Sequence, residues 1–160
     1  PESVLGLQKE YANCQTIPGD LQPLRIRLLS LARDKNVVGV AIESFRLGIT
    51  SPQVLMSVVH DAQAGEVASM VSVADSKPEE FGITADTQAT LRYALELAAQ
   101  DPEIGKLVSF YLDLAESTAF QLGNSKSAKF DHSGLSEAAR NEARAIAERV
   151  VKRVKNSSSL

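Results

Sequence analysis

The sequence is poor in cysteine and in large aromatic side chains. It has one cysteine, Cys14, and no tryptophan, and aromatic residues make up only 5% of its 160 positions. A lone cysteine excludes a disulfide bond within the chain and is typical of proteins from a reducing compartment. Because aromatic residues are so few, we expect a core of aliphatic side chains, which pack well between helices.

A long apolar run is also missing. No stretch approaches the roughly 20 apolar residues that cross a bilayer, and the first residues do not resemble a signal peptide. We therefore expect a protein without membrane contact, located in the cytoplasm or within an intracellular or viral assembly. The hydrophobic content of 44% is sufficient for one core and does not call for a second domain.

Motifs for catalysis and for cofactor binding are absent as well. The serines lack a Gly-x-Ser-x-Gly turn, and the scattered glycines form neither a dinucleotide-binding nor a P-loop fingerprint. His60-Asp61 resembles the His-Asp pair of metal-dependent phosphohydrolases. The only other histidine, His132, lies far downstream, so a multi-histidine site cannot be completed. The sequence predicts no catalytic, cofactor-binding or metal-binding residue.

What the sequence does contain is a series of helix signals. Ser51-Pro52 and Asp101-Pro102 each combine an N-cap side chain with a proline in the first turn. After Asp101, apolar residues recur at helical spacing as far as Leu122. The same periodicity predicts further helices over residues 20–32, 51–64, 85–100 and 133–155.

Two short β-branched stretches decide the fold class. Residues 37–42 and 67–73 fit strands lying between helices, which would give an α/β fold. Both stretches also place apolar residues on one helical face, and no strong hairpin signal occurs in the chain. We favour an all-α fold, a single-domain bundle of about six to seven helices, and keep the α/β fold as the alternative.

The predicted organisation has four parts. Residues 1–124 form the helical core, residues 125–134 a flexible hinge, residues 135–155 a basic amphipathic helix and residues 156–160 a disordered tail. The apolar seam of the basic helix is narrow, which is typical of an element at the edge of a bundle. On this organisation, deletion of residues 125–160 should leave the core folded and abolish association with a partner.

A helix-turn-helix is the strongest candidate motif. Residues 45–50 and the helix that starts at Ser51 resemble its first helix end, its glycine-containing turn and its recognition helix. A recognition helix needs side chains that reach base edges and phosphates, yet residues 52–64 contain no lysine or arginine. We therefore interpret this segment as an ordinary connection between two core helices.

Charge is distributed very unevenly behind the net charge of −3. Five acids and six bases lie in residues 1–60, eleven acids and three bases in residues 61–116, and four acids and eight bases in residues 117–160, so the balance runs +1, −8 and +4. An acidic middle and a basic end predict docking on a charged partner or on another copy of the chain. The candidate partner-binding or nucleic-acid-binding residues are Lys126, Lys129, Arg140, Arg144, Arg149, Lys152, Arg153 and Lys155.

Three functions follow as hypotheses, and none of them needs a cofactor. The first is a non-catalytic assembly or adaptor protein that forms homo-oligomers or binds a protein partner in a larger complex. The second is a nucleic-acid-binding accessory factor or packaging cofactor, which would contact only the phosphate backbone because no aromatic residue follows Phe130. The third is a small hydrolase-type enzyme with a site built from carboxylates and hydroxyls. We favour the first, which is not an enzyme.

Overall fold

The computed structural model of the chain describes residues 21–114 and 132–157. Within these two ranges the chain forms α-helices and one short 3-10 helix, and no strand. The α-helices are α2 (Leu21–Asp34), α3 (Val40–Arg46), α4 (Pro52–Gln63), α5 (Val67–Asp75), α6 (Ala85–Ala98), α7 (Pro102–Leu114) and α8 (Glu137–Ser157), and the 3-10 helix is η1 (Pro78–Phe81). The predicted all-α fold is confirmed, and the α/β alternative is wrong in these parts of the chain.

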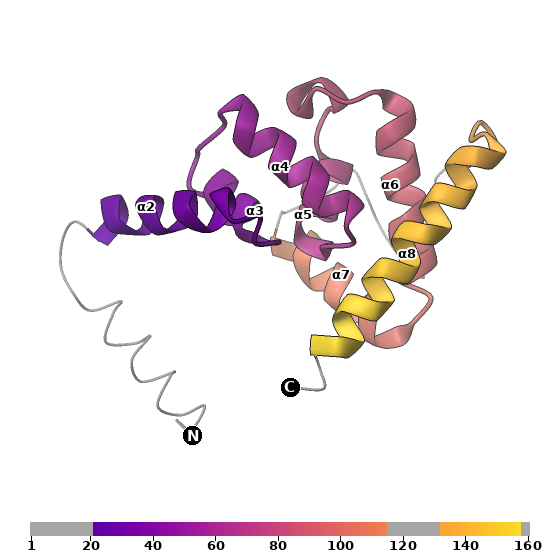
Figure 1. Cartoon of the computed structure of the whole chain (residues 1–160). Coiled ribbons are helices and arrows are strands. Elements are labelled where there is room, and N and C mark those ends of the chain that lie inside the picture. The colour runs from indigo at the N-terminus through magenta and orange to yellow at the C-terminus, as the bar shows by residue number, and fades with distance from the viewer. Residues whose placement is uncertain (1–20, 115–131, 158–160) are drawn as a thin grey trace.

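The helices pack around one core, except α2, which has no buried residue. Figure 1 shows α4, α5, α6 and α7 grouped in the centre, while α8 runs alongside α6 on one flank. On the other flank α2 contacts α3 and projects away from the group. The chain therefore places its C-terminal helix on the body of the fold and its first described helix at the periphery.

Local side-chain caps explain where several helices begin. The Ser51 hydroxyl accepts a hydrogen bond from the Val54 N–H, and the Asp101 carboxylate accepts one from the Glu103 N–H at 3.0 Å. Thr84 caps α6 in the same way, by accepting from the Thr87 N–H. Such caps satisfy amides that have no partner within the helix. The helix starts predicted at Ser51 and Asp101 are confirmed.

One core is shared by helices from both described parts of the chain. Its largest fully buried side chains come from α3, α4, α5, α6, α7 and α8. They are Ile42, Met70, Leu91, Leu95, Ile104, Ile146, Val54, Val58, Val71, Val73 and Val108. The segment predicted as a basic amphipathic helix packs on the core, with Ala143, Ile146, Ala147 and Val150 buried.

The two ambiguous stretches are helical for different reasons. Residues 67–73 belong to α5, in which seven of nine residues are buried. A helix covered on nearly all sides is apolar all round, so its sequence resembles that of a buried strand. Residues 37–42 are divided between a turn and α3, with Gly39 at a φ of +89° as the N-cap residue of α3. A left-handed residue at that position ends any extended run.

The region after residue 131 differs from the predicted hinge and tail. The His132 ring lies 4.4 Å from the Tyr93 ring of α6 and forms a hydrogen bond with the Glu96 carboxylate. At the other end α8 continues through Ser157, whose hydroxyl donates to the Arg153 carbonyl at 2.9 Å. Residues 156–157, which the sequence assigned to the tail, belong to this helix. Residues 125–131 of the predicted hinge, residues 158–160 and Cys14 lie outside the described residues.

None of the helices in the described parts of the chain is both long enough and apolar enough to span a membrane.

Candidate interaction surfaces

Two predicted partner-binding arginines of α8 are bound to the end of α4. The Arg149 guanidinium donates to the Gln63 carbonyl at 2.8 Å, and the Arg153 guanidinium donates to the Ala64 carbonyl at 3.2 Å. The last carbonyls of a helix lack partners within the helix and carry partial negative charge. Arg149 and Arg153 therefore cap α4 across the fold, which is a structural role that the sequence did not reveal.

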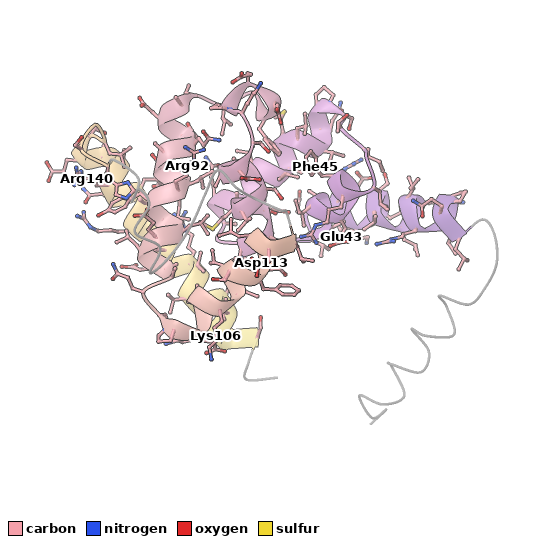
Figure 2. All side chains as sticks on the ribbon, turned by 180° about the vertical axis from the view of Figure 1, so that it is seen from behind. Glu43, Phe45, Arg92, Lys106, Asp113 and Arg140 are labelled. Atoms are coloured by element: carbon pink, nitrogen blue, oxygen red, sulfur yellow. The ribbon has the colours of Figure 1, made fainter. Side chains whose placement is uncertain are left out.

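Two further predicted residues also bind within the fold. Arg140 donates to the His132 carbonyl at 2.7 Å and to the Leu135 carbonyl at 3.2 Å, which fastens the segment before α8 (Figure 2). The Lys155 ammonium lies 3.2 Å from the Asp101 carboxylate at the start of α7 and lowers the pKa of Asp101. The Arg140 contacts are local to the start of α8, whereas the Lys155 contact joins the end of α8 to the start of α7.

The other four predicted residues are placed differently. Arg144 is exposed on α8 and donates to the side chain of Asn141 at 2.8 Å. Lys152 is also exposed on α8. Lys126 and Lys129 lie outside the described residues.

A basic groove lies where α8 passes the end of α4. Its volume is about 840 Å³. Its lining includes His60, Gln63, Glu142, Arg149, Lys152 and Arg153, so three of the predicted bases meet there beside one acid. Arg149 also lies 3.5 Å from Glu142. We call this feature the basic groove; it offers positive charge to an anionic ligand.

The His60-Asp61 pair has a structural arrangement. Asp61 is only 6% exposed, and its carboxylate accepts a hydrogen bond from the Gly39 N–H at 3.0 Å, at the start of α3. Burial raises the pKa of Asp61, and the Gly39 N–H opposes that effect. His60 is exposed on the outer side of α4. Among the described residues, no three His, Cys, Asp or Glu side chains gather to hold a metal ion.

One exposed apolar surface belongs to α2. The sequence places Leu21, Leu24, Leu28 and Leu31 on one side of this helix, and the structure leaves them 38%, 51%, 57% and 52% exposed. No residue of α2 is buried. We call these four residues the leucine face. The periodicity correctly predicted one apolar side of the helix, but that side does not face the core of the described fold.

Few contacts hold α2 on the body. Its first two turns are exposed at every position, and partial burial begins only at Leu29. An ion pair joins Arg25 to Glu43 of α3 at 3.5 Å, and Figure 2 shows Glu43 where the two helices meet. Exposed ion pairs of this kind contribute at most about 1 kcal/mol. The helix is thus attached mainly by its C-terminal end and presents its leucine face outward.

A second apolar surface lies at the junction of α5, α7 and α8. It is a groove of about 570 Å³. Its apolar lining consists of Val67, Leu107, Tyr111 and Val154, and its charged lining consists of Glu66, Glu103, Lys106 and Arg153. Figure 2 shows Lys106 and Asp113 towards opposite ends of α7. We call this feature the apolar groove.

No protein family model, no curated protein and no solved structure matches this chain. Function is therefore inferred from the chemistry of the leucine face and of the two grooves.

Proposed function

We propose that the protein is a non-catalytic assembly protein that associates with further copies of itself through the leucine face of α2. The observation that supports the proposal is a 14-residue helix without a buried residue and with four exposed leucines on one side. Soluble proteins seldom expose a continuous apolar strip unless it binds something. Amphipathic helices that lay such anchors into a groove are a recurring recognition mode.

The energetics of the leucine face favour association. Complete burial of one leucine side chain is worth about 1.5–3 kcal/mol, and each of these leucines still exposes roughly half of its surface. Covering all four would contribute roughly 3–6 kcal/mol before the entropic costs of association are subtracted. Few of these costs fall on α2 itself, because it is already helical. A helix formed in advance loses less conformational entropy when it binds.

Replacement of Leu24 and Leu28 together by aspartate tests the proposal. We expect the wild-type chain to form oligomers whose mass rises with concentration and the double variant to remain monomeric, because two charges then interrupt the apolar strip. The measurement is light scattering on a sizing column over a hundredfold range of concentration, at low and at high salt. Since neither leucine is buried, the unfolding curve of the body should not change.

Met56→Asp is the matched control. Met56 is 69% exposed on α4, so this change also replaces an exposed apolar side chain by a charge. This variant should form oligomers of the same mass as those of the wild type at each concentration. A wild-type chain that stays monomeric, or a Leu24→Asp/Leu28→Asp variant that assembles normally, would refute the proposed function.

We propose binding to a nucleic-acid backbone as a second candidate function, supported by the meeting of Arg149, Lys152 and Arg153 in the basic groove. Phosphate contacts of lysine and arginine release counterions. The logarithm of the binding constant therefore falls linearly with the logarithm of the salt concentration. Lys152→Ala should lower that slope by about one, whereas Lys77→Ala, at an exposed lysine outside the groove, should not change it. Fluorescence anisotropy with a labelled single-stranded oligonucleotide measures both slopes. Absence of binding at low salt would refute this candidate.

A further inference from the structure

We infer that the leucine face of α2 docks into the apolar groove of a second copy of the chain, so that copies join head to tail. The inference rests on the proposed function and adds the receptor surface to it. Each copy then provides one helix and one groove, and the two surfaces lie on different elements. A contact between two different surfaces repeats, and it forms a closed ring or an open filament.

The apolar groove continues into an exposed stripe along α7. Leu107 and Tyr111 line the groove, and Phe110 and Leu114 follow at 55% and 59% exposure. These four residues have the spacing i, i+3, i+4 and i+7, so they lie on one side of the helix. Apolar surface of this extent on a second helix supplies what the leucine face lacks, namely an apolar strip to pack against.

The aromatic part of the stripe is fixed in place. The Phe110 ring lies 5.4 Å from the Tyr111 ring in an edge-on arrangement, and the Arg46 guanidinium lies 5.6 Å from the centre of the Tyr111 ring. Both contacts are favourable for an aromatic ring. Because Tyr111 is already positioned, a docking helix would meet a preformed wall and lose less entropy on binding.

The dimensions of the two surfaces agree. The leucine face extends from Leu21 to Leu31, a rise of about 15 Å at 1.5 Å per residue. The stripe from Leu107 to Leu114 has a rise of about 10 Å, and the groove adjoins it between α5 and α8. One helix laid along α7 therefore covers the stripe and still reaches the groove.

Charge favours the groove over a second α2 as the docking partner. Helix α2 contains three arginines and one aspartate, so a symmetrical α2–α2 pair would bring two positively charged helices together. The groove is lined by two acids and two bases, so it is neutral overall and does not repel the positively charged α2. Like charges brought together across an interface oppose association, so the neutral groove is the more favourable partner for α2.

The helix of the same copy is not placed to fill the groove. Arg25 is paired with Glu43 at 3.5 Å, and the C-terminal half of α2 is partly buried at the body. From there α2 extends away from α7 and α8 (Figure 1). Docking within one copy would require these contacts to break, whereas docking between copies leaves them intact.

Mixing two defective variants tests the inference. The helix variant is Leu24→Asp with Leu28→Asp, and the groove variant is Phe110→Asp, at an exposed position where a charge does not threaten the fold. Each variant alone should lose self-association by about a hundredfold or more. An equimolar mixture should form a 1:1 dimer and no larger species, because the helix variant provides the intact groove and the groove variant provides the intact helix.

Two further variants complete the experiment. Leu107→Asp should behave like Phe110→Asp, provided that its circular dichroism and unfolding curve match those of the wild type. Ser109→Asp is the matched control on the same helix, since Ser109 is exposed and lies off the stripe; it should assemble like the wild type. Sedimentation velocity of each protein and of the mixtures gives the stoichiometry.

The outcomes separate this inference from the proposed function. If the helix variant fails to assemble while the groove variants assemble normally, α2 mediates assembly but docks elsewhere, and the inference is overturned alone. A mixture that contains only monomers also overturns it. If the wild type is monomeric throughout, both the inference and the proposed function fail.

Discussion

Gly65→Ala is expected to lower the free energy of unfolding by roughly 2–5 kcal/mol. Gly65 has a φ of +87°, and a Cβ atom there would lie 2.7 Å from the Val150 nitrogen and 2.9 Å from the Arg149 carbonyl carbon. The first feature strains any L-residue, and the second forces the backbone of α8 away from the turn between α4 and α5. Urea denaturation followed by circular dichroism measures the loss.

Gly48→Ala separates the two causes. Gly48 has a φ of +83°, close to that of Gly65, but nothing lies within 4 Å of a Cβ atom built on it. This variant should lose only the roughly 1–2 kcal/mol that the left-handed conformation costs an L-residue. Equal losses in the two variants would show that the turn does not press against α8.

The close approach at Gly65 also explains the roles of the arginines. Because the turn touches the backbone of α8, the guanidinium groups of Arg149 and Arg153 reach the final carbonyls of α4. The sequence identified the bases of the C-terminal segment correctly as a concentration of charge. It did not identify their acceptors, because Gln63 and Ala64 lie 86 and 89 positions earlier in the chain and their carbonyls carry no signal in the sequence.

Helix starts were predictable because their causes are local. Ser51 and Asp101 cap helices through hydrogen bonds to amides two or three positions away, so the necessary information lies within one turn. The apolar side of α2 was predictable for the same reason, since helical periodicity is a property of a short segment. All-α structure followed from such local signals.

Whether the apolar side of a helix becomes buried depends on the rest of the fold. The pattern of a short segment could not predict this for α2. The leucines of α2 and those of a core helix have the same spacing, yet α2 has no buried residue, whereas α5 has seven. The difference lies in which elements surround each helix. Patterning therefore indicated one apolar side that includes Leu24 and Leu28, but it could not indicate that this side stays exposed in the described fold.

Removal of residues 136–160 is expected to abolish the cooperative unfolding transition of the chain. The sequence suggested that the core would remain folded without its basic helix. In the structure α8 packs along α6 and buries Ala143, Ile146, Ala147 and Val150 in the common core. Its loss would expose the apolar side of α6 and release the caps of Arg149 and Arg153 from α4. Native domains are stable by only about 5–15 kcal/mol, so the loss of this part of the common core would leave little stability for the remainder.

Single substitutions on α8 measure the same dependence in the intact chain. Ile146 is 1% exposed, and Ile146→Ala should lower the free energy of unfolding by about 2–5 kcal/mol, because it leaves a cavity against α6. Lys152→Ala, on the exposed side of the same helix, should change it by less than about 0.5 kcal/mol. If the truncated chain keeps the wild-type urea midpoint and Ile146→Ala has no effect, α8 is an independent arm. The expected results would instead make α8 part of the folding unit.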